Sequence, residues 1–557
     1  MLRSLSTLTL LLLTTLTASA QPKAETVTSK GGVVVCVSPP AADVGLNTLK
    51  NGGNAVDAAV ATAFAMSVTW PEAGNIGGGG FMMIAAPGKD PTCIEYRETA
   101  PAAAKVDLFA DAKVTWLNHK AAGVPGTVRG LARAHKKYGK LEWKLVVMPA
   151  VELAEEGFTV NAALAVGLNR VLADRLTTNA AFKQTYGKLD GKPWKVGDTL
   201  VLKELGRTLR LIAEKGADAF YTGELAGLLE KEMKAEGGLI TRTDLEAYKA
   251  NERKPIHTTF RGYDVYGPPP PSSGGVALAE MLNILETFDL KKHSRWSPEA
   301  THLMIETMKR AYVDRARHLG DPDYTKIPPE LTTKDYAKKL AATIDMRKAT
   351  PSADLAPEIT LDKVSDSTTH FSVIDKDGLA VSNTYTLENS YGNRVVVRGA
   401  GYILNNEMTD FNARPGLTTR LGGIGTKPNQ IAPGKRMLSS MTPVIVLKDG
   451  KPVLITGSPG GRTIINTVLC VVLNVTEYGM TVAEAVSAPR FHHQWFPDVA
   501  RFEGVKDFPE LVTKLKPLGH SVTEARQGDA HSIGIDPKTG LRTGAADKRL
   551  DGKAVGE

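Results

Sequence analysis

The pattern of apolar positions predicts mainly helices in the first two thirds of the chain. Residues 41–70 form an apolar, alanine-rich helical stretch, residues 128–250 alternate helical periods with short loops, and Val276–Phe288 continues a helix after a proline- and glycine-rich break. The glycine cluster Gly74–Gly80 leads into an apolar run. Because glycine has no side chain, backbone is expected to lie close to backbone or ligand at this cluster.

After residue 367 the pattern changes to short β-branched runs separated by glycine turns. These runs predict strands, with one long helix at about Thr463–Tyr478. The predicted strands are Phe371–Ile374, Leu379–Thr386, Arg394–Val397, Val444–Leu447 and Val453–Thr456. Strands stacked under helices are therefore the expected layers. The preceding stretch, residues 345–366, is polar and weakly periodic and is expected to be exposed and mobile.

The first twenty residues are typical of a secretory signal. Arg3 supplies a positive start, Leu8–Leu16 is an apolar run, and Ala18–Ala20 offers a small-residue cleavage site. The run is too short to span a bilayer, although an uncleaved anchor is the alternative. The chain from residue 21 is therefore expected to be exported, to the periplasm or the extracellular space, without a stable membrane span.

Composition excludes several classes of protein. The 557 residues are 42% hydrophobic and 23% charged, with a net charge of +8 and no dense block of lysine and arginine, so a nucleic-acid partner is not expected. The three cysteines are widely spaced among apolar neighbours, which excludes a disulfide framework and gives no metal site. The glycine cluster precedes a strand rather than a helix, so it is not a dinucleotide fingerprint, and no cofactor is expected.

A predicted hairpin carries the first candidate chemistry. Strand period two places Thr368, His370 and Ser372 on one face, and Asp377-Gly378 is a hairpin turn that brings Thr386 beside Thr368. If the chain is cut before Thr368, the new α-amine has a pKa near 8, about two units below that of lysine. Such an amine can take the hydroxyl proton of its own residue and make it a nucleophile.

Three further segments suit acyl-transfer chemistry on a substrate with an amino-acid head group. Gly460 and Gly461 lie between a strand and a helix, where unblocked amides can donate to an oxyanion, each typically stabilising the transition state by about 3–4 kcal/mol. The acids of Leu404–Phe411 can hold an ammonium group. Hydroxyl groups in Arg436–Met441, together with an arginine, can hold a carboxylate.

With these segments, the chain resembles the γ-glutamyltranspeptidase (glutathione hydrolase) family. The resemblance runs in family order over roughly residues 25–550. Its motifs are Gly52–Ala59, Gly77–Phe81, Arg97–Pro101, Gly123–Gly126, Pro271–Gly275, Thr368–Ser372, Leu404–Met408, Leu438–Met441, Gly457–Gly461 and Ala488–Trp495.

The resemblance implies an α+β fold of the N-terminal-nucleophile hydrolase type, an αββα sandwich of two stacked antiparallel sheets between helical layers. It also implies self-cleavage of a precursor between Ser367 and Thr368. The expected parts are a signal peptide (1–20), a heavy chain (21–367) and a light chain (368–557) that remain together as one fold.

The resemblance further assigns roles residue by residue. Thr368 corresponds to the nucleophile, Thr386 to the threonine that hydrogen-bonds it, and Gly460 and Gly461 to the oxyanion hole. The expected clamp on the glutamyl α-carboxylate is Arg97, Ser439 and Ser440; the expected holders of its α-amine are Glu388, Glu407 and Asp410. The implied partners are glutathione and other γ-glutamyl compounds, with water, amino acids or dipeptides as acceptors.

Some features depart from the family pattern or leave alternatives open. Glu388 stands where some members have Asn, and Pro415–Pro433, which matches a flexible lid, lacks the aromatic residue of some bacterial members. Thr369 and Ser367 are the alternative nucleophiles. The rival functions are a related acylase for another acyl group, such as a glutaryl side chain, and an uncut, inactive binding protein.

Overall fold

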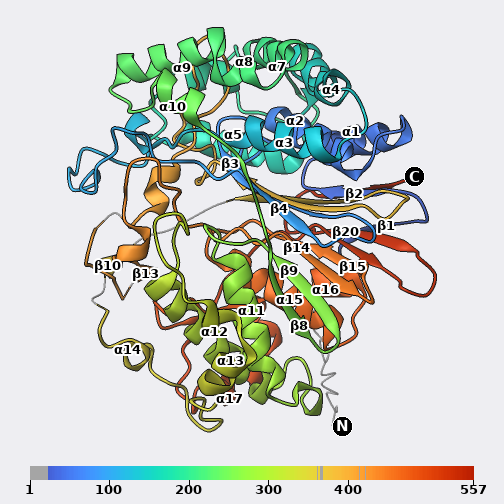
Figure 1. The fold of residues 1–557 in the computed structure, drawn as a ribbon, viewed down its shortest axis with the longest axis vertical. Helices are drawn as coiled ribbons and strands as arrows, with labels where there is room; N and C mark the ends of the chain where they lie inside the picture. Colours follow the sequence, from blue (N-terminus) through green and yellow to red (C-terminus); the bar gives the residue numbers. More distant parts are fainter. Residues whose placement is uncertain (1–22, 360–361, 364–367, 413, 421) are drawn as a thin grey trace, which may run out of the picture.

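The computed structural model describes residues 23–359, 362–363, 368–412, 414–420 and 422–557. The predicted signal peptide and Ser367 lie outside the described residues. Two seven-stranded sheets lie face to face between two helical layers, as Figure 1 shows. This is the αββα arrangement that the resemblance implies.

Both sheets are antiparallel throughout and combine strands from distant parts of the chain. In order, sheet I contains β1 (Glu25–Ser29), β20 (Arg542–Ala546), β19 (Ser532–Ile535), β15 (Lys451–Thr456), β14 (Val444–Lys448), β9 (Tyr263–Gly267) and β8 (Ile256–Phe260). Sheet II contains β21 (Lys553–Gly556), β2 (Val33–Cys36), β11 (Thr369–Ile374), β12 (Ala380–Thr386), β3 (Gly79–Ala85), β4 (Thr92–Glu95) and β7 (Asn251–Arg253).

The first helical layer covers the outer face of sheet II and lies at the top of Figure 1. It consists of α1 (Pro39–Lys50), α2 (Ala55–Thr69), α3 (Thr127–Tyr138), α4 (Trp143–Glu156), α5 (Ala162–Ala173), α6 (Ala180–Tyr186), α7 (Lys203–Lys215), α8 (Asp218–Tyr221), α9 (Gly223–Glu236) and α10 (Arg242–Ala247). The predicted apolar stretch 41–70 is thus two helices, separated at Asn51–Asn54, where the Asn54 side chain caps α2.

The second helical layer covers sheet I and lies at the bottom of Figure 1. Its helices are α11 (Gly274–Glu286), α12 (Pro298–His318), α13 (Lys334–Ala341), α14 (Ser352–Leu355), α15 (Thr463–Thr476), α16 (Val482–Ser487) and α17 (Pro509–Leu515). Among the residues that the structure describes, no helix combines the length and apolar character needed to cross a bilayer.

Short strand pairs complete the fold. They are β5 (Phe158–Thr159) with β6 (Thr199–Leu200), β10 (Asp362–Lys363) with β13 (Gly422–Gly423), and β16 (Phe491–His492) with β17 (Ala500–Phe502) and β18 (Val522–Glu524). The predicted strand Arg394–Val397 is wrong. Its residues are almost entirely buried, but within the described chain Val396 makes only an isolated bridge to Ile403.

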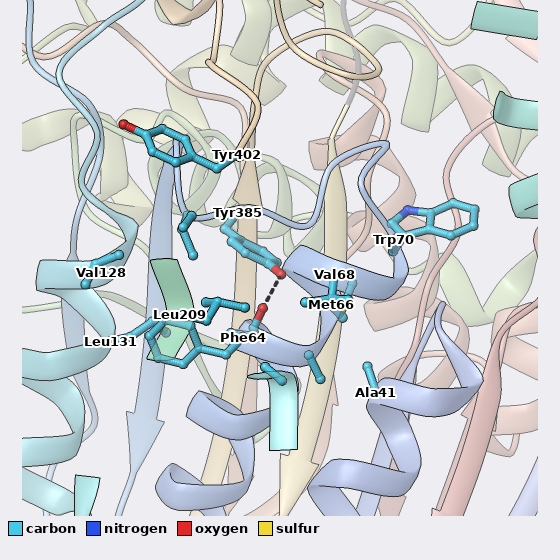
Figure 2. Packing of buried hydrophobic residues seen from close by; sticks show 14 of the residues in the cluster. Ala41, Phe64, Met66, Val68, Trp70, Val128, Leu131, Leu209, Tyr385 and Tyr402 are labelled. Atoms are coloured by element: carbon cyan, nitrogen blue, oxygen red, sulfur yellow. Dashed lines mark hydrogen bonds between the residues drawn. The ribbon is translucent and has the colours of Figure 1, made fainter. Parts of the chain in front are cut away.

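Strand period two explains why sheet II is apolar on both faces. In β2, Val34 and Cys36 pack among the first helical layer, whereas Val33 and Val35 belong to the cluster that includes sheet I. Figure 2 shows the helical side of this packing around Phe64 and Tyr385, whose hydroxyl donates a 3.0 Å hydrogen bond to the Ala63 carbonyl. The three cysteines are buried and unpaired, as their apolar neighbours predicted.

The stretch before residue 360 is largely exposed, but it is tied to the second helical layer. His302 bonds the Asp345 carbonyl at 2.9 Å, and Lys309 donates to the Thr350 carbonyl at 2.5 Å. The Ser352 amide donates to Asp498 at 2.9 Å. The chain leading towards residue 367 is therefore anchored at several points, which the prediction of an exposed, mobile stretch did not include.

Candidate active site

The hairpin β11–β12 brings the two predicted threonines together. Thr369 pairs with Tyr385 and each further residue follows in register, so Thr368, one residue before β11, stands beside Thr386 at the end of β12. Thr386 is buried, and its Oγ1 accepts a 2.9 Å hydrogen bond from the Glu388 amide. The predicted register is therefore confirmed.

A buried histidine supports this hairpin from the side of sheet I. His370 lies between Thr384 Oγ1 at 2.8 Å and Ser372 Oγ at 3.1 Å. Burial lowers the pKa of His370 well below its usual value, so the ring is neutral at physiological pH. Its contacts are with the strands themselves, which makes it a packing group under Thr368.

The glycine turn between β15 and α15 approaches the same place. Gly460 and Gly461 have φ values of +126° and +53°, which side chains rarely allow. The Gly460 carbonyl accepts bonds from the amide and the hydroxyl of Thr463, at 3.0 and 2.8 Å. These bonds direct the carbonyl towards the helix start, and Gly461 lines the cavity in front of Thr368.

Arg97 forms the centre of a buried acidic cluster. Its two terminal nitrogens donate to Glu407 and Asp410, and its Nη1 lies 3.5 Å from Glu98. Burial raises the pKa of the Glu407 carboxyl well above its usual value, partly opposed by Arg97. Burial also raises the pKa of Glu98, to about 7. The cluster thus contains three carboxyl groups, from Glu98, Glu407 and Asp410, around the single guanidinium group of Arg97.

Glu388 extends this acidic side. It has a positive φ of +77°, is almost completely buried, and accepts a hydrogen bond from the Asn406 side chain. A non-glycine residue with positive φ is uncommon and marks a position that the surrounding structure holds in place. Its carboxylate therefore faces the cavity as part of the fold.

The hydroxyl pair Ser439-Ser440 is held by the Pro-Ser-Ser-Gly-Gly segment at the start of α11. The Ser439 amide donates to the Pro271 carbonyl at 2.9 Å, and the Ser273 amide donates to the Ser439 carbonyl at 2.8 Å. Ser272 Oγ donates to the Met441 carbonyl at 2.5 Å. The proline- and glycine-rich break before Val276 is therefore an ordered turn, and it also fixes the backbone of the serine pair.

One cavity, partly open to solvent, joins these groups. It brings together nine of the predicted residues: Arg97, Thr368, Thr386, Glu388, Glu407, Asp410, Ser439, Ser440 and Gly461. Gly460 is next in sequence to this lining but is not part of it, and Ser367 lies outside the described residues.

The cavity also contains residues that sequence reasoning missed. Arg315 of α12, Asn429 and Arg462 line it. Arg436, which precedes the serine pair in sequence, pairs through its Nε with Glu95 at 2.8 Å. Arg315 lies 125 residues before Ser440, in a helix without a recognisable motif, so only the fold reveals their proximity.

A metal-like grouping occurs elsewhere. Within the described residues, His302, Glu306 and His520 bring potential ligand atoms within 4.8 Å of one another. However, His302 and His520 are hydrogen-bonded to each other at 2.7 Å, and Glu306 is paired with Lys309 and Arg310. Two protein cations already neutralise this carboxylate, which disfavours a bound metal ion.

The fold has four layers, and a threonine directly before a central strand faces a glycine turn. These features define the N-terminal-nucleophile hydrolase class. The chain belongs to the γ-glutamyltranspeptidase family. The sequence model of this family, described as Gamma-glutamyltranspeptidase, matches residues 41–557. It is 48% identical over 532 residues to a glutathione hydrolase proenzyme of Escherichia coli, covering 94% of this chain and 91% of that one.

Solved structures agree with this assignment. A cephalosporin acylase from Bacillus halodurans matches with a TM-score of 0.85 and 27% identity, covering 98% of this chain and 99% of that one. The Helicobacter pylori γ-glutamyltranspeptidase matches with a TM-score of 0.55 and 39% identity, covering 57% of this chain and 92% of that chain. The fold is thus shared by an enzyme named a cephalosporin acylase and by one named a γ-glutamyltranspeptidase.

Proposed function

We propose that the protein is a γ-glutamyltranspeptidase and glutathione hydrolase. It transfers the γ-glutamyl group of glutathione, or of another γ-glutamyl compound, to water or to an amino acid or peptide. The observation that carries the proposal is a single cavity in which Thr368 meets acids for an ammonium group and hydroxyls with an arginine for a carboxylate. This combination suits an α-amino acid whose side chain carries the reacting amide.

The proposed reaction passes through an ester on Thr368. Its Oγ attacks the γ-carbonyl carbon while its own α-amine takes the hydroxyl proton. The C–N bond then breaks, and the proton passes to the departing amine. Water or an acceptor amine attacks the ester next, which forms the product and returns the proton to Thr368.

The surrounding residues have distinct proposed roles. Thr386 orients the nucleophile, and the amides of Gly460 and Gly461 stabilise the oxyanion. Arg97, Ser439 and Ser440 hold the α-carboxylate of the donor. Glu388, Glu407 and Asp410 hold its α-amine.

The α-amine of Thr368 exists only after the chain is cut, so the proposal includes self-cleavage between Ser367 and Thr368. The resulting heavy chain is 21–367 and the light chain is 368–557. The name proenzyme of the Escherichia coli relative supports such a processing step. Export to the periplasm or the extracellular space, after removal of residues 1–20, is proposed from the signal-like sequence of Arg3–Ala20.

The rival function is an acylase for a group without an α-amine, which the similarity to a cephalosporin acylase favours. Such a substrate has no ammonium group to place against Glu388, Glu407 and Asp410. The three carboxyl groups would then have no ammonium group of the substrate to bind. Comparing turnover of γ-glutamyl and glutaryl anilides at equal concentration separates the two functions.

The substitution Thr368→Ala tests the nucleophile. We expect the variant to remain one uncut chain and to show no turnover of γ-glutamyl-p-nitroanilide, because both the hydroxyl and the cleavage depend on this residue. Gel electrophoresis and a colorimetric assay measure the two effects. The purified wild type is expected to show two bands, the smaller one beginning Thr-Thr-His-Phe.

The matched control is Thr369→Ala, which changes the next residue on the opposite face of β11. It should still be cut and should keep most of its activity. Normal turnover by Thr368→Ala, or loss of cleavage only in Thr369→Ala, would overturn the assignment of the nucleophile.

A further inference from the structure

A second arginine, Arg315 of α12, lies at the cavity beside the serine pair. It is almost completely buried and lines the cavity together with Thr368, Ser439 and Ser440. Its Nη2 donates to Ser440 Oγ at 2.9 Å, and its Nε donates to Ser273 Oγ at 2.9 Å. One guanidinium group thus holds two hydroxyls from different segments.

The second of these contacts extends to Ser439. Ser273 Oγ accepts from Arg315 and donates its own proton to the Ser439 carbonyl at 2.6 Å. Arg315 therefore positions Ser440 directly and the backbone of Ser439 through Ser273. A planar group with donors at fixed spacing can do both at once, whereas a lysine ammonium is a single point charge.

These contacts also determine which way the serine hydroxyls donate. Ser440 Oγ accepts from Arg315, and Ser439 Oγ accepts from the Met441 amide at 3.0 Å. Each oxygen already receives a hydrogen bond from the protein, and each hydroxyl still has one proton to donate. Within the described residues no acceptor for either proton is recorded, so both are available to an acceptor in the cavity.

The surroundings of Arg97 differ from those of Arg315. Arg97 is hydrogen-bonded to Glu407 and Asp410, with Glu98 nearby. The hydrogen bonds that orient the serine pair come from Arg315, so the hydroxyls are positioned by a side chain other than Arg97.

We propose that Arg315 is a positioning and specificity residue for the donor carboxylate. It orients Ser439 and Ser440 as a pair of hydrogen-bond donors, and so selects γ-glutamyl compounds that carry an α-carboxylate. This inference rests on the proposed transferase function and adds to it the residue that distinguishes a carboxylate-bearing donor from one without it.

The test compares two competitive inhibitors that differ only in the carboxylate, L-glutamate and 4-aminobutyrate. They are assayed against γ-glutamyl-p-nitroanilide with the mature wild type and with Arg315→Gln. We expect the variant to raise the inhibition constant of L-glutamate, and the KM of the donor, by about tenfold to a hundredfold, the usual range for lost charge-assisted hydrogen bonds. The inhibition constant of 4-aminobutyrate should change less than threefold.

Two further variants keep the test decisive if Arg315→Gln does not mature. Arg315→Lys retains the charge but not the fork, so it should recover only part of the discrimination between the two inhibitors. Ser273→Ala removes only the connection to Ser439 and should raise the inhibition constant of L-glutamate by a few fold. The control is Arg317→Gln, two residues further along α12, where the side chain is paired with Glu358 at 2.7 Å.

The outcomes separate this inference from the function on which it rests. If the wild type does not turn over the γ-glutamyl donor, the proposed function fails. If the wild type is active but binds both inhibitors equally, or if the Arg315 variants weaken both inhibitors by the same factor, the function stands and the specificity role of Arg315 is overturned.

Discussion

At the scale of single residues, Gly457 lies close to His370, which shares a face of the hairpin strand with the nucleophile. A Cβ atom at position 457 would lie 2.4 Å from two atoms of the His370 imidazole ring. The ring is fully buried and cannot move aside without displacing β11, the strand that begins directly after Thr368. Glycine is therefore required at position 457, because the His370 ring occupies the space that a side chain would need.

The substitution Gly457→Ala should accordingly displace the nucleophile. We expect a loss of about 1–3 kcal/mol of unfolding free energy, as for other overpacked cores, and at least a tenfold fall in kcat. Thermal unfolding and donor turnover measure the two effects. The control is Gly479→Ala, where φ is +66° and no atom lies within 4 Å, so the substitution strains the backbone without touching the site. Equal turnover in both variants would contradict the prediction.

Residues close in sequence could be placed from the sequence, whereas those joined only by the fold could not. Thr386 was correctly placed beside Thr368 because one hairpin with a recognisable turn joins them. Arg315 could not be placed beside Ser440, because nothing local links a helix to a loop 125 residues later. Arg97 was identified only by the family resemblance, and its hydrogen bond to Glu407 explains its position in the site.

At the scale of elements, α12 has a buried polar face that holds the chain leading towards the proposed cut. His302 bonds the carbonyl of Asp345, Lys309 that of Thr350, and Arg310 Nη2 that of Thr343 at 2.8 Å. Helical spacing places the three side chains along one side of the helix. The sequence predicts this stretch to be exposed and mobile because it is polar and weakly periodic, and nothing in it indicates the bonds to α12.

The substitution Lys309→Met tests this anchor. It removes the bond to the Thr350 carbonyl, while Glu306 retains its partner Arg310 at 2.8 Å. We expect trypsin to cut the native protein several times faster after Arg347 and Lys348, because local opening becomes easier. Mass spectrometry of timed digests measures the rate.

Lys338→Met is the control for this anchor, since Lys338 is mostly exposed and pairs only with Asp335 at 3.3 Å within the described residues. The same cutting rate in Lys309→Met and the control would show that α12 does not hold the segment.

The prediction of strands from apolar runs also failed where only the fold decides the outcome. The valine run after Arg394 is buried without forming a ladder, because residues with positive φ, including Arg394 and Gly399, turn the chain at both ends.

At the scale of the whole molecule, strands from the two sides of the proposed cut alternate in both sheets. In sheet II, β21 precedes β2, followed by β11 and β12 and then β3. In sheet I, β1 pairs with β20, and β9 pairs with β14. Cleavage before Thr368 therefore leaves two chains that cannot separate without breaking both sheets. The sequence predicted the layers, but pairings such as Val33 with Gly556 join the two ends of the chain and left no local pattern.

The C-terminal strand should therefore stabilise the site from a distance. Deleting residues 553–557 removes β21 and exposes the edge of β2, which pairs directly with β11. It also removes the Glu557 carboxylate that accepts from the Gly32 amide at 2.9 Å. From the lost apolar burial and main-chain hydrogen bonds, we expect a loss of about 3–5 kcal/mol.

Chemical denaturation of the mature protein, together with the extent of cleavage on a gel, measures this loss. Lys553→Ala, which removes only a partly exposed pair with Asp43 at 2.7 Å, should change stability by less than about 1 kcal/mol. Because β2 lies between β21 and β11, the deletion should also slow cleavage before Thr368 while the control does not. A truncated protein that unfolds and matures like the wild type would show that the strand bearing the nucleophile is held by its hairpin partner β12 alone.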